Sequence, residues 1–252
     1  MSETAATPVL ELRELRRSFG GVKAVDGITL SVLAGDVVAL IGPNGAGKST
    51  LFALMMGELA ASAGEIHLDG RDMRRLSARA HARAGIGRTF QAPRLFAGLS
   101  VWENILAALG ARTNRSDREG PPPADALGEV GLYERRAELA GSLSQGQRKR
   151  LELAMVLALR PRLLLLDEPT AGMGVAERAA VMELVMAAVQ WRRLTMVFCE
   201  HDMETVFAHA DRVVVMDRGA IVADGTPREV REDPHVQSVY LGGGFSHGGA
   251  PR

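Results

Sequence analysis

The chain has 252 residues, of which 46% are hydrophobic, and its 30 Lys plus Arg are balanced by 30 Asp plus Glu. This balance argues against nucleic acid as the main partner, because phosphate binding usually requires a basic excess, and the single cysteine, Cys199, excludes an internal disulfide. No apolar run approaches the ~20 residues of a membrane-spanning helix and no signal-peptide core is seen, so we expect a cytosolic protein that reaches a membrane only through a partner.

The first third of the chain alternates like antiparallel strands. In DGITLSVLAGD, Ile28, Leu30 and Val32 fall on one face, which is typical of a half-exposed strand. Asp69-Gly70, after EIHL, predicts a hairpin turn.

Three apolar runs do not alternate: VVALI (37–41), LLLL (163–166) and MVFC (196–199). Strands that are apolar on both faces belong inside a parallel sheet covered by helices. Such sheets bind ligands at the carboxyl ends of their strands, and each of these runs is followed there by polar or glycine-rich residues.

Helical spacing dominates between about Pro93 and Arg160, interrupted by the polar, proline-rich loop GARTNRSDREGPPPA. The tail GGGFSHGGAPR has too little apolar material to pack, so we expect it to be mobile. The expected organisation is one domain over 8–241, with a core of about 8–92 and 160–241, a helical subdomain of about 93–159 and a tail of 242–252.

The stretch LIGPNGAGKSTLF carries the most specific single motif. Residues 42–49 fit G-x-x-x-x-G-K-[ST] between an expected strand and an expected helix, the context that a phosphate-binding loop requires. Glycines let backbone N–H groups surround a phosphate at the positive end of the next helix. Lys48 would then reach the β- and γ-phosphates and Ser49 would bind Mg²⁺. An ordinary glycine-rich turn is the alternative.

Asp167 and Glu168 follow the second apolar run in LLLLDEP. Phosphoryl transfer needs a carboxylate that holds Mg²⁺ and a group that activates the attacking water. Because adjacent residues at a strand end point in different directions, we predict that Asp167 serves the metal, through water, and Glu168 serves as general base. The alternative is an acidic pair that solubilises a loop.

The stretch LSQGQRKRLELA begins with an S-x-x-Q capping box made by Ser144 and Gln147, which predicts the start of a helix. A sharper interpretation is that the Ser144 hydroxyl and the Gly146 N–H form an anion site at the helix N-terminus. No phosphate-binding loop lies near this site in the sequence. Two chains arranged head to tail would therefore complete two nucleotide sites.

With these motifs in this order, the chain resembles the nucleotide-binding subunits of ATP-binding cassette (ABC) transporters from about Leu10 to Leu241. GPNGAGKST matches the Walker A motif, Gln91 the Q-loop glutamine, LSQGQ the signature, LLLLDEP the Walker B motif and His201 the switch histidine. The resemblance implies an α/β fold of the P-loop NTPase (RecA-like) class. Its parallel-sheet core would carry an N-terminal antiparallel β subdomain and an inserted helical subdomain. It also implies ATP and Mg²⁺ as cofactors and ATP hydrolysis coupled to transport.

The resemblance also implies roles for single residues. Phe19, 29 positions before Lys48, would stack on adenine; the alternative is a core phenylalanine. Gln91 would contact Mg²⁺ or the lytic water, and His201 would contact the γ-phosphate and Glu168; a surface-loop amide and a structural hydrogen-bonder are the alternatives. The implied nucleotide contacts are Phe19, Val25, Gly42, Pro43, Asn44, Gly45, Ala46, Gly47, Lys48, Ser49, Thr50, Ser144, Gly146 and Gln147.

Two positions depart from the commonest family pattern. Gln145 replaces a glycine of the signature, and Gly174 replaces the aspartate of the D-loop. The second departure puts the usual D-loop contacts across a dimer in doubt, but not nucleotide binding. Cys199 is expected to pack in its strand as a small hydrophobe.

The variable stretches FGGVKAVDG, GIGRTFQAPRLF, EPTAGM, CEHDM and GTPREVREDPHVQSVYLG resemble ATP-binding subunits for uptake of branched-chain and other hydrophobic amino acids. Urea and short-amide importers share much of this pattern. An ABC ATPase acting on DNA or ribosomes is a further alternative, although the chain has neither a long coiled-coil insertion nor a second cassette. A non-catalytic nucleotide-binding scaffold would not need the set Lys48, Asp167, Glu168 and His201.

The expected partners follow from the same resemblance. Integral membrane permease subunits would insert a short helix at Arg94, Leu95, Phe96 and Trp102, unless these residues form a self-contained helical core. A second ABC ATPase subunit, identical or paralogous, would complete the dimer, and an extracytoplasmic solute-binding protein would act indirectly. The protein would lie peripherally on the cytoplasmic face of the cell (inner) membrane and bind no nucleic acid.

Overall fold

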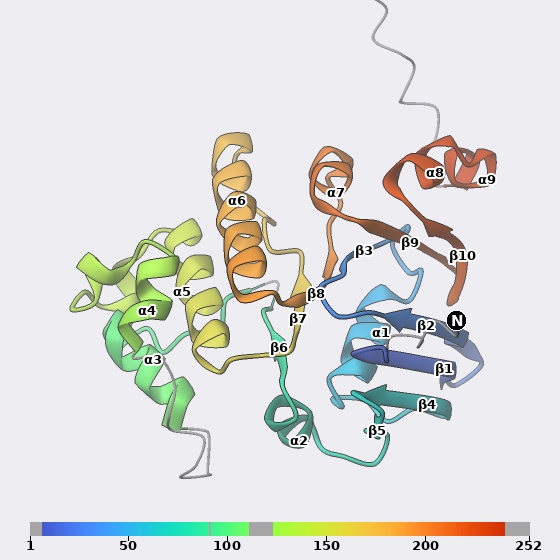
Figure 1. The fold of residues 1–252 in the computed structure, drawn as a ribbon, viewed down its shortest axis with the longest axis horizontal. Coiled ribbons are helices and arrows are strands. Elements are labelled where there is room, and N and C mark those ends of the chain that lie inside the picture. The colour runs from blue at the N-terminus through green and yellow to red at the C-terminus, as the bar shows by residue number, and fades with distance from the viewer. Residues whose placement is uncertain (1–6, 91, 111–122, 240–252) are drawn as a thin grey trace, which may run out of the picture.

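The chain forms two β-sheets surrounded by helices (Figure 1). The computed structural model describes residues 7–90, 92–110 and 123–239. The smaller sheet has the strand order β2-β1-β4-β5 and the larger the order β10-β9-β3-β8-β7-β6. The strands are β1 (Leu10–Phe19), β2 (Val22–Val32), β3 (Val37–Ile41), β4 (Ala63–Leu68), β5 (Arg71–Asp72), β6 (Ile86–Arg88), β7 (Leu163–Asp167), β8 (Thr195–Cys199), β9 (Arg212–Asp217) and β10 (Ala220–Gly225).

The smaller sheet is antiparallel throughout, as the sequence predicts. Ile28, Leu30 and Val32 of β2 are buried. Asp69 and Gly70 have φ of 49° and 77° and join β4 to β5 as a two-residue hairpin turn, in which consecutive positive φ values are required. Both local predictions are confirmed.

The larger sheet is parallel from β9 to β6, and only its edge strand β10 runs antiparallel. Val37, Ala39 and Ile41 of β3 face one hydrophobic core, while Val38 and Leu40 face the other. Strands β7 and β8 divide their residues in the same way. The three apolar runs lack alternation because both faces of these strands are covered.

The helices are α1 (Lys48–Met55), α2 (Ala78–Arg83), α3 (Val101–Gly110), α4 (Pro123–Glu129), α5 (Gln145–Ala158), α6 (Val175–Arg192), α7 (Met203–His209), α8 (Pro227–Glu232) and α9 (Pro234–Val239), with 3₁₀ turns η2 (Tyr133–Arg135) and η3 (Ala140–Ser142). Helices α3, α4 and α5 lie together at one end of the molecule (Figure 1). Between residues 93 and 159 the described part of the chain contributes to neither sheet.

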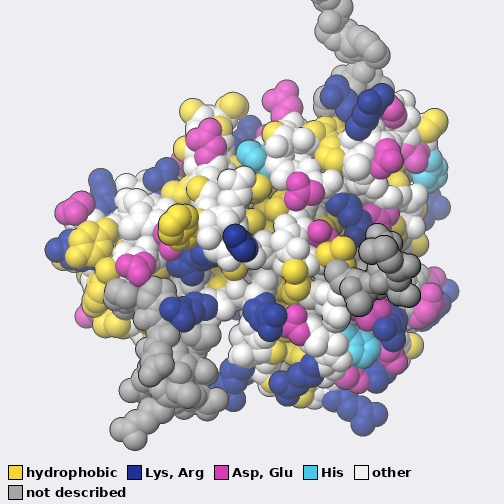
Figure 2. Space-filling view, in the orientation of Figure 1, with side chains coloured by type: hydrophobic (Ala, Val, Ile, Leu, Met, Phe, Trp, Pro, Cys, Tyr) yellow, Lys and Arg dark blue, Asp and Glu magenta, His cyan; other side chains and the backbone are white. Residues whose placement is uncertain are grey.

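Parts of the expected organisation fall outside the described residues: most of the proline-rich loop, at 111–122, and the tail 242–252. The subdomain boundaries at 93 and 159 stay a prediction. Over the described ranges, no helix is long and apolar enough to cross a bilayer. Acidic and basic side chains are interspersed over the face shown in Figure 2, consistent with the balanced composition.

Candidate nucleotide-binding and catalytic site

The glycine-rich loop connects the buried strand β3 to α1. Gly42, Gly45 and Gly47 have φ of 152°, 83° and 103°. Residues other than glycine rarely adopt these backbone angles. A Cβ atom at Gly42 would lie 2.2 Å from the carbonyl oxygen of Met216, and one at Gly47 would lie 2.1 Å from that of Ala24. The loop therefore needs glycine both for its dihedral angles and for its close approach to β9 and β2.

Lys48, the first residue of α1, folds back over this loop. Its Nζ donates to the carbonyl oxygens of Gly42, at 2.5 Å, and Pro43, at 3.1 Å. Burial lowers the pKa of the Lys48 ammonium, and the nearby carboxylates of Glu168 and Asp167 partly oppose this shift. The cation thus lies at the loop that is predicted to hold phosphates, with Ser49 exposed beside it at the start of α1.

Asp167, the last residue of β7, is paired with an arginine that the sequence analysis did not single out. Its Oδ2 accepts a hydrogen bond from Nη2 of Arg88 at 3.1 Å, and Nη1 of the same guanidinium lies 2.6 Å from Oε2 of Glu58. Arg88 ends β6, the neighbour of β7 in the sheet, and its side chain is only 9% exposed. Arg88 therefore links the carboxylate predicted for Mg²⁺ to the segment after α1.

Glu168, the next residue, contacts His201. Its φ is 48°, and its backbone N–H donates to the carbonyl oxygen of Cys199. Oε1 of Glu168 lies 2.8 Å from Nε2 of His201. The two carboxylates after β7 therefore face different partners, as predicted for adjacent residues at a strand end. Cys199 is buried and packs in β8, as expected, and burial raises the pKa of its thiol.

A buried carboxylate, Glu200, holds the loop that follows Glu168. It accepts hydrogen bonds from the backbone N–H of Thr170 at 2.9 Å and from the Thr170 hydroxyl at 2.7 Å. The sequence analysis missed this residue; a charged residue directly after a strand that is apolar on both faces was the available signal.

The signature LSQGQ begins α5. Ser144 caps the helix: its Oγ accepts from the N–H of Gln147 at 3.3 Å, and Gln147 Oε1 accepts from the N–H of Ser144 at 3.0 Å. The predicted capping box is confirmed. Ser144 is exposed, whereas Gly146 is buried against α6, where a Cβ atom would lie 2.0 Å from Oε1 of Glu177.

The two departures from the family pattern lie close together. Gln145 donates from Nε2 to the carbonyl oxygen of Ala171 at 3.3 Å. Ala171 belongs to the loop TAGMG, which ends at Gly174, the N-cap of α6. Within the described chain, no hydrogen bond or ion pair joins residues 143–147 to residues 42–49, which agrees with two half-sites in different places.

Gln91 lies outside the described residues. The residues on both sides of it are held by α5. Lys149 donates from Nζ to the carbonyl oxygen of Phe90 at 2.7 Å, and Oε1 of Glu152 accepts from the N–H groups of Phe90 at 3.2 Å and Arg94 at 3.1 Å. The sequence analysis missed both residues, although their i, i+3 spacing places them on one face of a helix.

The remaining predicted nucleotide contacts differ in exposure. Phe19 is 44% exposed at the end of β1, with the Arg17 guanidinium 4.7 Å from its ring centroid. The alternative of a core phenylalanine is therefore wrong. Val25 and Ala46 are buried in the same core, and their predicted nucleotide contacts stay a prediction. Asn44 is exposed at the tip of the loop.

The residues predicted to receive a membrane subunit differ in their exposure to solvent. Phe96 is 57% exposed, whereas Leu95 and Trp102 pack against the larger hydrophobic core. The Arg94 guanidinium lies 3.8 Å from the ring centroid of Phe90. Phe96 and Arg94 are thus the members of this set that present side chains to solvent.

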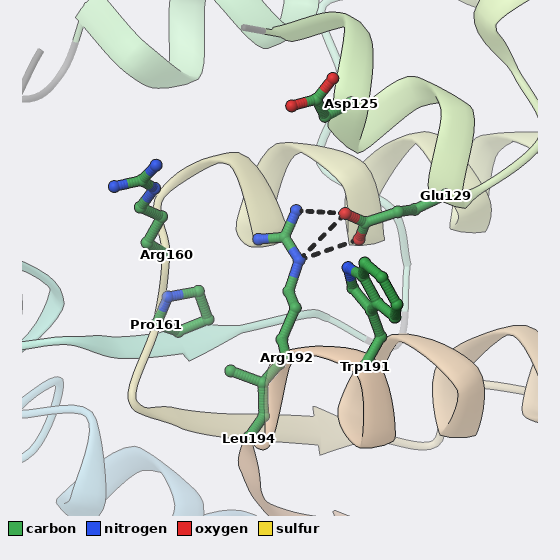
Figure 3. A pocket seen from close by; sticks show the side chains of 7 residues that line it. All are labelled: Asp125, Glu129, Arg160, Pro161, Trp191, Arg192 and Leu194. Carbon is green, nitrogen blue, oxygen red and sulfur yellow. Dashed lines mark hydrogen bonds and ion pairs between the residues drawn. The ribbon is translucent and has the colours of Figure 1, made fainter. Parts of the chain in front are cut away.

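A surface pocket of about 480 Å³ lies between α4 and the end of α6 (Figure 3). None of the predicted site residues lines it. Arg192 crosses it and binds both carboxylate oxygens of Glu129, at 2.8 to 3.2 Å, and also the carbonyl oxygen of Leu157. This pocket marks a point where the helices at the end of the molecule are attached to the core.

The residues present fit a magnesium ion. Ser49 supplies a hydroxyl and Asp167 a carboxylate, the hard oxygen donors that Mg²⁺ prefers. The described residues contain no cluster of three or more His, Cys, Asp or Glu that could hold a metal.

Comparisons with known proteins agree with this geometry. Residues 25–171 match the family described as ABC transporter, and residues 220–246 match branched-chain amino acid ATP-binding cassette transporters. The chain is 40% identical to the high-affinity branched-chain amino acid transport ATP-binding protein BraF of Pseudomonas aeruginosa, over 93% of this chain and 98% of BraF. It is 35% identical to LivG of Salmonella typhimurium, a protein with the same description, over the same shares.

Among solved structures, the ADP conformation of MJ1267, an ATP-binding cassette of an ABC transporter, superposes with a TM-score of 0.83 at 30% identity, over 93% of this chain and 99% of MJ1267.

Proposed function

The chain belongs to the ABC transporter family of ATP-binding subunits, and on that basis we propose that it hydrolyses ATP to energise uptake of branched-chain or other hydrophobic amino acids through separate membrane subunits. The solute class rests on the similarity to BraF and LivG and on the match over residues 220–246. The alternatives, a urea or short-amide importer and an ATPase acting on DNA or ribosomes, are not favoured by these relatives.

The contact between Glu168 and His201 is the observation that carries the catalytic part of the proposal. A carboxylate 2.8 Å from a histidine, beside a buried lysine on a glycine loop, supports the activation of water next to a bound phosphate. In our proposal Glu168 takes a proton from water as the water oxygen bonds to the γ-phosphorus and the bond to the β-phosphate oxygen breaks. His201 holds the carboxylate and the γ-phosphate in place.

The other residues bind the substrate. Backbone N–H groups from Gly42 to Thr50 surround the phosphates, Lys48 leaves the loop carbonyls for the phosphate oxygens, and Phe19 stacks on adenine. Its exposed ring supports this last role. Ser49 and Asp167 would hold Mg²⁺, with Gln91 as a further candidate. The bound metal would offset charge on the β- and γ-phosphates.

A complete site requires a second chain in this proposal. Ser144, Gly146 and Gln147 would contact the nucleotide held by a second ABC ATPase subunit, identical or paralogous, and that subunit would do the same in return. Ser144 is exposed, and within the described residues no hydrogen bond or ion pair joins the signature to the chain's own glycine loop; both observations support such sharing.

The remaining partners are proposed from the relatives. Permease subunits would dock at the surface that includes Arg94 and Phe96, within a helical subdomain of about residues 93–159, and would hold the protein on the cytoplasmic face of the inner membrane. A solute-binding protein would act on the other side.

The test is co-purification of the tagged chain from its own membranes, followed by reconstitution of the recovered complex into vesicles. We expect ATP-dependent accumulation of radiolabelled leucine, isoleucine or valine, with inorganic phosphate released in the absence of other enzymes. Accumulation of urea instead would assign the alternative importer. Recovery with ribosomes or DNA, and without permease subunits, would overturn the transport function.

A further inference from the structure

Helix α5 is attached to the chain around Phe90 by two buried charged side chains. Lys149 and Glu152 are each only 4% exposed. Lys149 donates to the carbonyl oxygen of Phe90, and Glu152 accepts from the N–H groups of Phe90 and Arg94. These three hydrogen bonds, which we call the clasp, join α5 to backbone about 60 positions earlier in the chain.

Stability by itself does not account for the clasp. Charged side chains that are buried are often no more stabilising than apolar side chains of similar volume. Burial lowers the pKa of the Lys149 ammonium and raises the pKa of the Glu152 carboxyl, so burying each charged form costs free energy. Within the described residues, Oε2 of Glu152 is buried without a hydrogen-bond partner. Lys149 and Glu152 are costly to bury and make directional hydrogen bonds. These properties favour a role in positioning the backbone that they bind.

Both ends of the clasp lead to parts of the nucleotide site. Lys149 lies one helical turn after Gln145, so α5 connects the clasp rigidly to Ser144 and Gly146 at the helix start. On the other side, Arg88 lies two residues before Phe90, with its guanidinium 4.8 Å from the Phe90 ring centroid, and is paired with Asp167. A short path of side-chain contacts therefore runs from Asp167, at the end of β7, through Arg88, Phe90 and Lys149 to the helix that begins at the signature.

We propose that Lys149 and Glu152 are positioning residues that make the backbone at Phe90 and Arg94 move together with the signature, so that nucleotide binding in one chain presents Ser144 and Gly146 to the second chain. This inference rests on the proposed two-chain function. Lys149 and Glu152 would connect the two half-sites of one chain mechanically. Their loss should therefore weaken closure of the dimer without weakening the binding of ATP.

The experiment replaces the clasp by apolar side chains of similar length, Lys149→Met with Glu152→Met, in a Glu168→Gln background that slows hydrolysis. The matched control is Arg228→Met with Glu232→Met, which removes an exposed ion pair on α8. Like the clasp variant, it leaves the net charge unchanged. ATP affinity is measured with a fluorescent ATP analogue. Dimerisation with ATP is measured by analytical ultracentrifugation over a range of protein concentrations.

We expect the clasp variant to bind ATP within about twofold of its parent and to require at least about tenfold more protein for half-dimerisation, a shift of about 1.4 kcal/mol. Lys149→Arg, which keeps a charged donor, should dimerise as the parent does, and so should the α8 control. Equal dimerisation of the clasp variant and the parent would overturn the proposal. A parallel loss of ATP binding would also overturn it, because it would indicate a role in the fold alone.

Two further outcomes are separable. If the Glu168→Gln parent itself stays monomeric with ATP, the two-chain function fails, and this inference fails with it. If the double variant does not fold, Glu152→Gln decides the question, because it keeps the side-chain volume and weakens the acceptor. A shift of about threefold or more in half-dimerisation, with ATP affinity unchanged, then supports the clasp, since hydrogen bonds to charged acceptors are the stronger ones; no shift overturns it.

Discussion

Nε2 of His201 lies 2.8 Å from Oε1 of Glu168, although the two residues are 33 positions apart. The contact follows from the parallel register of β7 and β8, in which Asp167 is paired with Cys199. Each side chain leaves the sheet just after this pair, so both reach the same edge. The carboxyl ends of adjacent parallel strands are where open α/β sheets bind ligands.

Replacing Glu168 by Gln should stop turnover while leaving ATP binding intact. Glutamine keeps the volume and one oxygen for His201 but cannot accept a proton from water. We expect ATP hydrolysis to fall by about 10²-fold or more, measured as phosphate release, with ATP affinity within about twofold of wild type. Glu183→Gln, on an exposed position of α6, is the control and should hydrolyse normally. Normal turnover by Glu168→Gln would remove it from the general-base role.

Replacing His201 by Ala should affect chemistry more than stability. The histidine side chain is about half exposed, so we expect a change in unfolding free energy within about 0.5 kcal/mol. Loss of a donor beside developing phosphate charge should lower kcat by about 10²-fold, with a smaller change in KM. His201→Gln should retain part of the activity. A variant that unfolds more easily but turns over normally would instead indicate a structural histidine.

Gly146→Ala should separate folding from dimer closure. The added Cβ would displace the flexible Glu177 side chain, so we expect a loss of stability of about 1 kcal/mol or less. We expect ATP-induced dimerisation to weaken by about tenfold, or 1.4 kcal/mol, because the surface offered to the second nucleotide changes shape.

Gly128→Ala is the matched control, since Gly128 is exposed in α4 and a Cβ there would meet nothing within 4 Å. If both alanine variants dimerise alike in sedimentation experiments, the packing of Gly146 has no bearing on closure.

Arg88→Met should destabilise the fold through the two carboxylates that it holds. Asp167 and Glu58 would each lose a charged donor, and we expect a loss of about 1–3 kcal/mol in urea unfolding. Arg162→Met removes an arginine from an exposed pair with Asp69 and should change stability by less than about 1 kcal/mol. Similar effects of the two changes would show that the link through Arg88 adds nothing beyond a surface pair.

Glu152 predicts a particular pH dependence of stability. Burial raises the pKa of its carboxyl above 4.5, opposed by the hydrogen bond from Arg94 and the charge of Lys149. The folded protein then holds this proton more tightly than the unfolded chain. The stability of wild type relative to Glu152→Gln should therefore fall as the pH rises above about 4.5 and level off once the folded-state pKa has been passed. Urea unfolding of both proteins between pH 4 and 7 measures this difference.

The opposite slope, or none, would mean that the Glu152 carboxyl is not held at a raised pKa by its buried position. Glu183→Gln, at an exposed site on another helix, is the matched control and should track wild type across the range.

Local rules explain what could be predicted. The capping box of Ser144 and Gln147 and the turn at Asp69 depend on residues two or three positions apart. The glycine loop depends on φ values that glycine adopts most easily. The three strands without polar alternation were recognised because a strand that is buried on both faces is a continuous run of apolar residues. The resemblance to a known family supplied roles for Phe19, Gln91 and His201 that no local rule would suggest.

The sequence by itself determined the phosphate loop, the carboxylates after the second apolar run and the start of the signature helix, because each is encoded within a few consecutive residues. Only the tertiary structure decided which charges meet: Arg88 with Asp167 across 79 positions, and Lys149 with Phe90 across 59. These contacts depend on strand order and on how α5 packs against the core. Strand order and helix packing leave no periodic pattern in the sequence. A charged residue that is buried with a partner therefore cannot be told from an exposed one by the sequence alone.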